Sequence, residues 1–260
     1  SEEGRHTLMI FNAGSFLAMP RDLQLRVVKL AAGQNGFTHV VIESRAELVH
    51  ESAVSPIADA LRDAGKRLTV RIGVETEDDH LRLRVLKKGH KRSELTRATE
   101  VLHSCGARVG GYSLLNPAPG LSKEWALAEA KKTIDWILAA PPDGLGMDEA
   151  YFCSTNVGPG TPLEREWRAG KFFPATLLMV LTVLEYSILG YGSRVHLLPF
   201  QDEPELLAVP SNHVPRGIAQ DLHDAEGCDL AFHRMFAAYR STMDPGVLIP
   251  PVCDRVSEHI

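Results

Sequence analysis

Short apolar runs alternate with amphipathic segments along most of this chain. The apolar runs predict strands over residues 7–12, 39–43, 69–75, 109–115, 149–154 and 195–198. The amphipathic segments predict helices over residues 20–30, 55–61, 92–104, 122–140, 163–168, 175–189, 217–222 and 229–240. A strand followed by a helix recurs roughly every 30 to 40 residues, which is typical of parallel βα units wound into a barrel or an open sheet. No internal repeat divides the chain, so we expect one domain with a C-terminal helical extension.

The predicted strands end in polar residues. The third strand ends at Glu75, and an acidic turn then leads into a predicted basic helix that carries Lys87. The other polar strand ends are Asn12-Ala13-Gly14-Ser15, Glu43-Ser44-Arg45, Asn116-Pro117 and Cys153-Ser154-Thr155-Asn156. The carboxyl ends of parallel strands in a barrel meet at one mouth, where such folds bind ligands. We therefore expect these polar groups to line a single cavity.

Two carboxylates on adjacent predicted strands, Glu43 and Glu75, are suited to bind paired hydroxyl groups such as those of a ribose. Gly14 has no side chain, which lets its backbone approach a ligand closely. The alternative is that both carboxylates form structural ion pairs with Arg45 and Arg71. The residue types leave both interpretations open.

The composition is that of a globular protein, with 260 residues of which 44% are hydrophobic and 23% are charged. The net charge of −5 argues against nucleic acid as a partner, because nucleic-acid binding needs clustered Lys and Arg. The longest apolar run, residues 175–189, is interrupted by polar residues and predicts a buried helix rather than a membrane span. No signal-peptide pattern opens the chain, so we expect a cytoplasmic protein without a membrane partner.

The four cysteines, at positions 105, 153, 228 and 253, show no C-x-x-C spacing. We expect a reduced protein whose sequence completes no zinc or iron–sulfur motif. Cys153 ends a predicted strand at the mouth, where it would contact substrate; the alternative is a small buried hydrophobic residue. Cys228 and His233 lie on one predicted helix and are a weak candidate metal pair, since no further ligand is near in sequence.

Five segments occur in an order that resembles one branch of the radical S-adenosylmethionine (SAM) enzymes, the elongator-subunit-like and archaeosine-synthase-partner branch. The segments are FNAGSFL, VIESRAELV, RIGVETEDDHLRLRVLKKG, GYSLLNPAP and NVGPGTPLEREW. The family reads approximately TSGSFLD, ESRPE, GLET followed by NKG, LLKP and NVQRGT. The resemblance implies a partial TIM-type (βα) barrel of parallel strands over residues 1–200, which is a radical SAM core without its first βα unit. A helical or irregular extension packed on it is expected over residues 201–260.

The resemblance also implies which residues bind the cofactor. Asn12, Gly14 and Ser15 would belong to the turn whose backbone holds the amino group of SAM. Glu43 and Glu75 would lie at its ribose and methionyl portion.

The same resemblance implies a role for the basic segment after the third strand. Lys87 would lie near the methionyl carboxylate, where a cation is electrostatically favourable. Lys88 and Arg84 are alternatives for this contact, and a solvated Lys87 without any role is another. Arg45 would orient Glu43.

The chain departs from the family in one central feature. The C-x-x-x-C-x-x-C loop that follows the first barrel strand of the family and holds a [4Fe–4S] cluster is absent from this sequence. We expect a segment outside this sequence to supply it, because the strand at residues 7–12 would otherwise be an exposed edge. The alternative is a relative without a cluster. Ala46 replaces the usual proline, and Asn116 stands where the family often has lysine, which leaves the substrate open.

The resemblance implies a radical SAM enzyme of the transferase or lyase type that cleaves SAM to modify a small molecule. The expected outcome is a 5′-deoxyadenosyl radical or transfer of the 3-amino-3-carboxypropyl group, with an electron donor such as flavodoxin or ferredoxin. One alternative is a clusterless partner subunit that binds SAM or a nucleoside without catalysis. Another is a TIM-barrel lyase with Glu75 and Lys87 as acid and base, which is disfavoured because Lys87 does not end a strand.

Overall fold

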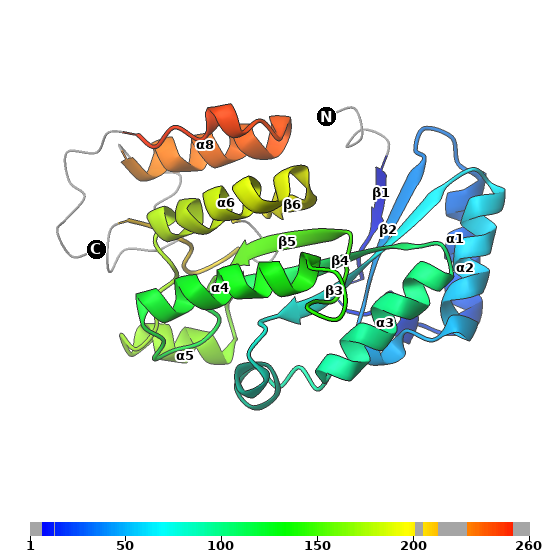
Figure 1. Ribbon diagram of the computed structural model, residues 1–260, viewed down its shortest axis with the longest axis horizontal. Helices are drawn as coiled ribbons and strands as arrows, with labels where there is room; N and C mark the ends of the chain where they lie inside the picture. The colour runs from blue at the N-terminus through cyan, green and yellow to red at the C-terminus, as the bar shows by residue number, and fades with distance from the viewer. Residues whose placement is uncertain (1–6, 13, 201–204, 213–227, 252–260) are drawn as a thin grey trace. The chain divides into compact units, whose positions relative to one another are not determined.

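The computed structural model describes residues 7–12, 14–200, 205–212 and 228–251. Its strands are β1 (Thr7–Ile10), β2 (His39–Ser44), β3 (Arg67–Glu75), β4 (Arg108–Leu115), β5 (Glu149–Ser154) and β6 (Val195–Leu197). Its helices are α1 (Arg21–Gly33), α2 (Glu51–Asp63), α3 (Arg92–Ser104), α4 (Lys123–Leu138), α5 (Pro162–Arg168), α6 (Leu177–Tyr191) and α8 (Cys228–Thr242). The strands form one six-stranded sheet in the order β1 to β6 (Figure 1). This succession of parallel strands and helices is a partial TIM-type barrel, which confirms the predicted fold class.

The elements follow the sequence prediction closely, with two exceptions. The bounds of α3 and β5 are those expected, and the other strands differ from the prediction by two residues or fewer at either end. Helix α2 begins earlier than expected, and the predicted basic helix after β3 is a single turn over Leu81–Val85. The helix predicted over residues 217–222 lies outside the described residues.

Helix α2 begins at Glu51, one turn before its predicted start, so that Pro56 lies inside it. Proline lacks the N–H that would donate to the carbonyl of Ser52, four residues earlier. The guanidinium of Arg21 supplies a donor instead, at 3.2 Å from the Ser52 carbonyl and 2.7 Å from that of Ala53. The predicted start was wrong because this arginine, distant in sequence, satisfies the helix carbonyls.

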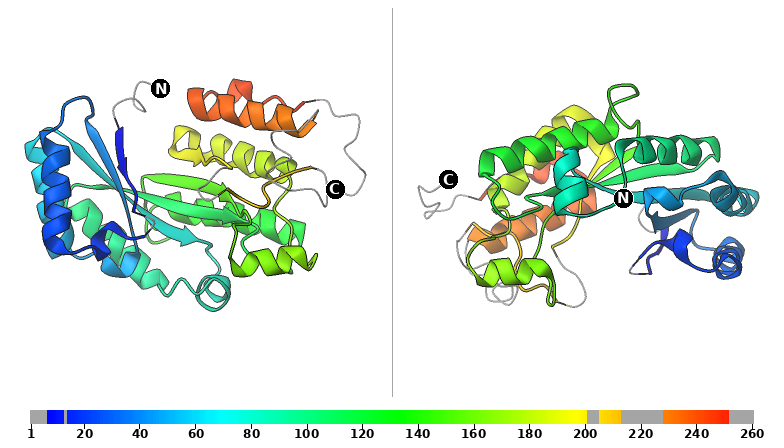
Figure 2. Two further views of the ribbon diagram at one scale, coloured as in Figure 1. Left: turned by 180° about the vertical axis from the view of Figure 1, so that it is seen from behind. Right: turned by 90° about the horizontal axis from the view of Figure 1, so that it is seen from below.

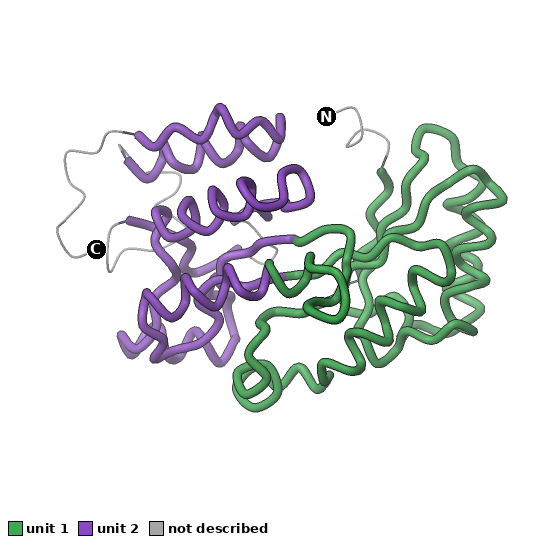
Figure 3. The backbone as a smooth tube through the Cα atoms, viewed as in Figure 1, with its two compact units in different colours: residues 1–112, 135–150 green, residues 113–134, 151–260 purple. Residues whose placement is uncertain are grey.

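The chain forms two compact units, one of residues 1–112 and 135–150 and the other of residues 113–134 and 151–260 (Figure 3). The predicted domain boundary at residue 200 stays a prediction. Among the described residues, no helix combines the length and the apolar character that crossing a membrane requires.

In the first unit, β1, β2 and β3 pair in parallel. Helices α1, α2 and α3 lie on the same side of these strands (Figures 1 and 2). Glu43 of β2 is in register with Arg71 of β3, so both side chains point to the same face of the sheet near the carboxyl ends of the strands. The buried core of this unit includes Val40, Ile42, Ile57, Leu61, Val70, Ile72, Leu95 and Leu102.

In the second unit, helices α6 and α8 pack on β6. The hydroxyl of Tyr239 in α8 donates a hydrogen bond to the Val195 carbonyl at 3.4 Å, and Tyr151 stacks on His196 with ring centroids 4.9 Å apart. The side chain of Thr176 caps α6 by accepting a hydrogen bond from a backbone N–H of its first turn.

Candidate functional site

Strand β3 ends in a strained and buried carboxylate. Glu75 has a φ of 69°, in the left-handed region that costs a non-glycine residue on the order of 1 kcal/mol or more. Its Oε1 lies 2.6 Å from the Nζ of Lys88. A Cβ atom on Gly73 would lie only 2.4 Å from this Oε1, so the carboxylate fills space that a larger residue would occupy. Gly73 thus leaves room for this carboxylate, and Lys88 binds it. Backbone strain of this kind concentrates at functional sites.

The lysine that pairs with Glu75 is Lys88 rather than Lys87. Lys87 lies two residues beyond the single helical turn Leu81–Val85 and has a φ of 53°, so its predicted place on a helix is wrong. Its side chain is exposed and forms no ion pair or hydrogen bond with the described residues. The left-handed backbone at Lys87 directs the two side chains differently. Lys88 neutralises Glu75, and Lys87 keeps an uncompensated charge.

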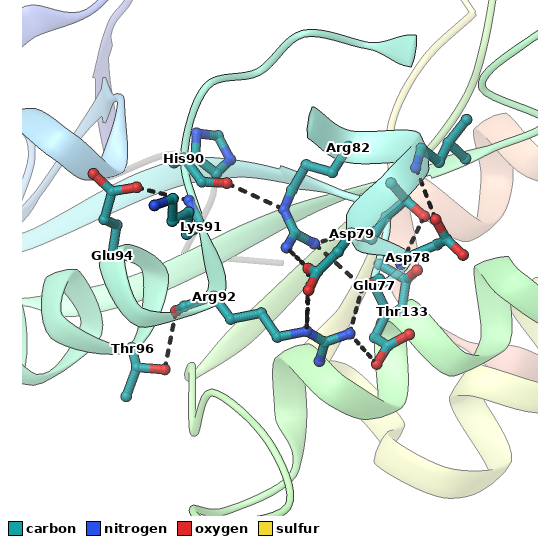
Figure 4. A network of polar contacts seen from close by, with 12 residues as sticks. Glu77, Asp78, Asp79, Arg82, His90, Lys91, Arg92, Glu94, Thr96 and Thr133 are labelled. Carbon is teal, nitrogen blue, oxygen red and sulfur yellow. Dashed lines mark hydrogen bonds and ion pairs between the residues drawn. The ribbon is translucent and has the colours of Figure 1, made fainter. Parts of the chain in front are cut away.

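A buried guanidinium anchors the loop that carries both lysines. Arg82 is fully buried within the first unit. Its partners are the carbonyls of Thr76 at 2.7 Å, Glu77 at 3.2 Å and His90 at 3.3 Å and the carboxylate of Asp79 (Figure 4). Burial lowers the pKa of Arg82, while Asp79 opposes that effect. The two ends of the loop, at Thr76 and His90, are thereby tied to one side chain.

Arg92, the first residue of α3, is a second clamp on the same loop. It pairs with Glu77 and with Asp79, the latter at 3.1 Å. The guanidinium carbon of Arg92 lies 4.6 Å from the ring centroid of Trp136, and that of Arg82 lies 5.4 Å from it. The acidic turn after β3 therefore serves to fix the loop.

Glu43, on the strand next to Glu75, accepts a hydrogen bond from the hydroxyl of Tyr112 in β4. Burial raises the pKa of Tyr112, so its hydroxyl stays protonated and donates. Arg45 pairs with Glu47 at 2.5 Å, so the expectation that Arg45 orients Glu43 is wrong. The role of Tyr112 gave no sequence signal, because it lies within the apolar run of its strand.

The turn after β1 is fixed at Ser15. The Oγ of Ser15 lies 3.0 Å from the Oγ of Ser44 and accepts a hydrogen bond from the N–H of Arg45 at 3.1 Å. Asn12 and Gly14 are exposed, and a Cβ atom on Gly14 would meet nothing closer than the Asn12 carbonyl at 4.0 Å. Ser15 thus ties the turn to the end of β2, while the backbone at Asn12 and Gly14 stays open to a ligand.

A pocket of about 290 Å³ lies in the first unit at the ends of β2 and β3. We call it the basic pocket; its lining residues are Ser44, Arg45, Gly73, Lys87, Lys88 and His90. Arg45 and Lys88 each have a carboxylate partner, so Lys87 gives the pocket its net positive charge. A pocket with a free cation next to the Glu75 carboxylate suits a ligand that has both an anionic group and hydroxyl groups.

Two predicted residues lie in the second unit. Cys153 is partly buried and not in a disulfide, and its thiol lies 3.2 Å from the carbonyl of Ser154. The side-chain amide of Asn116 donates to the Phe173 carbonyl at 2.9 Å, which fixes the backbone after α5. Asn116 thus has a structural contact where the family often has lysine.

The described residues do not fit a [4Fe–4S] cluster. They contain no group of three or more His, Cys, Asp or Glu side chains arranged to hold a metal ion. Cys105 is free, whereas Cys228 is disulfide-bonded. The expectation of a fully reduced chain is therefore wrong at Cys228.

The fold defines a class, a partial TIM-type barrel, and relatives make it more specific. No protein-family model matches the chain. It is 31% identical over 188 residues to a protein named archaeosine synthase subunit beta from Thermococcus kodakarensis, over 71% of this chain and 55% of the relative. It is 25% identical over 249 residues to a protein of the same name from Methanosarcina acetivorans, over 94% of this chain and 65% of the relative. The chain therefore spans between 55% and 65% of the length of these two relatives.

A solved structure shows the same fold. The archaeal Methanocaldococcus infernus Elp3 with an N-terminal deletion matches with a TM-score of 0.62 at 17% identity, over 92% of this chain and 55% of that chain. Together these comparisons confirm the resemblance of the chain to the elongator-like branch of the radical SAM superfamily, the branch that includes archaeosine synthase partners.

Proposed function

We propose that this protein binds SAM in its first unit and acts as a radical SAM enzyme that modifies a small molecule. The observation that carries the proposal is the arrangement of Gly73, Glu75 and Lys88. A strained strand end, a missing Cβ and an ion pair hold one buried carboxylate beside the basic pocket. SAM has ribose hydroxyls that need an acceptor and a carboxylate that needs a cation, and both kinds of partner lie here.

Five of the predicted residues have a role in this proposal. Glu75 and Glu43 accept hydrogen bonds from the ribose hydroxyls and the methionyl portion. The carbonyls of the open backbone at Asn12 and Gly14 accept from the amino group. The free ammonium group of Lys87 binds the methionyl carboxylate.

Further partners follow from the resemblance alone. The substrate is a small molecule that Cys153 contacts, and reducing electrons come from a donor such as flavodoxin or ferredoxin. Since the described residues do not fit a cluster, the chain contributes the binding and orientation of SAM, and we assign it no step of bond cleavage.

A second candidate is a SAM-binding or nucleoside-binding partner subunit without catalysis. The names of two relatives favour it, because each is called a subunit of a synthase. In that case the first unit still binds its ligand, and catalysis belongs to a complex.

Analysis of SAM cleavage separates the two candidates. The natural protein, expressed from its own gene and purified without oxygen, is incubated with SAM and dithionite, and the products are separated by chromatography. Formation of 5′-deoxyadenosine supports the radical route, and 5′-methylthioadenosine supports transfer of the 3-amino-3-carboxypropyl group. A protein that binds SAM but forms neither product contradicts the enzyme and supports the partner subunit. A protein that does not bind SAM contradicts the proposal.

A further inference from the structure

His90 is buried at the wall of the basic pocket, and neither of its ring nitrogens makes a hydrogen bond of normal geometry with the described residues. The residue is 3% exposed. Buried polar atoms are rarely left unpaired, because an unsatisfied donor or acceptor costs about 1–3 kcal/mol. A buried imidazole beside a pocket that makes no hydrogen bond of normal geometry to the Glu47 carboxylate or the Gly73 carbonyl therefore points to a ligand.

The carboxylate of Glu47 faces the same imidazole. Its Oε1 lies 2.5 Å from Nη2 of Arg45, whereas its Oε2 lies 3.9 Å from Nδ1 of His90 and has no hydrogen-bond partner. An acceptor on the Nδ1 side favours the tautomer that carries its proton on Nδ1. Nε2 then carries a lone pair and can only accept a hydrogen bond. It can donate to a ligand oxygen only after the ring gains a second proton.

Burial favours the neutral ring when no anion is bound. Burial lowers the pKa of His90, and Arg82 and Lys88 lower it further. Glu47, from the turn after β2, and the Gly73 carbonyl of β3 oppose them. An anion in the pocket would add a negative charge near the ring, which favours the protonated imidazole.

We propose that the basic pocket binds an oxyanion and that His90 takes up one proton from solvent as it does so. The imidazolium then donates from Nδ1 to Glu47 and from Nε2 to the ligand oxygen. Lys87 contributes the compensating charge at the pocket rim. When the ligand is SAM, the oxyanion is its methionyl carboxylate, an assignment that rests on the function proposed above.

Sulfate tests the pocket without SAM, because it does not titrate near neutral pH. The histidine ring signals are followed by NMR during a sulfate titration, and the His90 signals are assigned by their loss in His90→Gln. We expect them to move saturably from the neutral to the protonated position. Lys87→Gln should weaken sulfate about tenfold, and because Lys87 is exposed this variant keeps the test valid even if His90→Gln does not fold. A His90 ring that stays neutral throughout the titration overturns the proposal.

The matched control is His103→Gln. His103 is an exposed histidine of the same unit, 3.0 Å from Asp148 and outside the basic pocket. Its removal should leave the sulfate response of His90 unchanged. A loss of that response in the control contradicts a local effect at the pocket.

Calorimetry with SAM tests the carboxylate assignment. Titrations in two buffers of different ionisation enthalpy give the number of protons taken up, and 5′-methylthioadenosine, which lacks the amino-acid group, serves as the comparison. The protein should take up close to one proton more when it binds SAM than when it binds 5′-methylthioadenosine. His90→Gln should remove this difference. Equal uptake by both ligands refutes the contact with the carboxylate. Protonation of His90 when sulfate binds, in a protein that fails to bind SAM, supports the pocket and refutes the proposed function.

Discussion

The Cβ position of Gly73 lies 2.4 Å from the Oε1 atom of Glu75, so this glycine and this carboxylate share one space. The neighbouring atom is the end of a flexible side chain, so a methyl group at position 73 displaces the carboxylate without disturbing the strand. The glycine thereby sets where the carboxylate can lie.

Gly73→Ala should weaken the binding of SAM while changing the stability of the protein little. We expect the unfolding free energy to change by less than about 1 kcal/mol, because the clash is with a side chain that can rotate and the partly exposed Lys88 can follow it and remain its ion-pair partner. The affinity for SAM should fall about tenfold, since Glu75 leaves its place. Calorimetry and denaturant unfolding measure the two quantities. Gly33→Ala in α1, where a Cβ atom meets nothing within 4 Å, is the control and should keep full affinity.

Lys88→Gln and Lys87→Gln should differ in stability. Lys88 neutralises a carboxylate that is 9% exposed, so its loss leaves a buried charge without its ion-pair partner and should cost about 1–3 kcal/mol of unfolding free energy. Lys87 is exposed and pairs with no described residue, so its substitution should stay within about 0.5 kcal/mol. Urea unfolding measures both. Equal effects would contradict the assignment of Lys88 as the partner of Glu75.

Arg82→Met should destabilise the protein strongly. The substitution removes the donor to three buried carbonyls and the partner of Asp79, which should cost about 3 kcal/mol or more. Arg84→Met, on the same turn but exposed, should cost less than about 0.5 kcal/mol. Thermal and urea unfolding of the pair test the anchoring role of Arg82, and a small loss in Arg82→Met would disprove it.

His90 should make stability depend on pH. Burial lowers its pKa in the folded protein, so below the unfolded value of about 6.5 the unfolded state binds more protons than the folded state. Unfolding free energy should therefore fall as the pH drops below about 6.5, and His90→Gln should flatten this fall. His233, whose pKa burial also lowers, leaves a remaining slope of the same sign in that variant. Urea unfolding over a pH series measures the slope, and an unchanged slope in His90→Gln would count against a buried neutral His90.

Much of the fold and part of the site follow from the sequence. The apolar run that stops at Glu75 predicts both the strand and the carboxylate at its end, because a buried strand cannot continue through an unpaired charge. The choice of Lys88 over Lys87 was not predictable, since it depends on the left-handed backbone conformation of Lys87. Nor was the burial of Arg82, a charged side chain that is satisfied by backbone carbonyls that only the folded loop brings together.

The central claim is that Glu75 of the first unit contacts SAM. Calorimetric titration of SAM into the wild-type protein and Glu75→Gln tests it most directly, with the exposed Glu124→Gln as control. We predict saturable binding to the wild type and the control, and at least a tenfold loss, about 1.4 kcal/mol, in Glu75→Gln. Equal affinity of Glu75→Gln and the wild type, or no binding of SAM to either, would contradict the account.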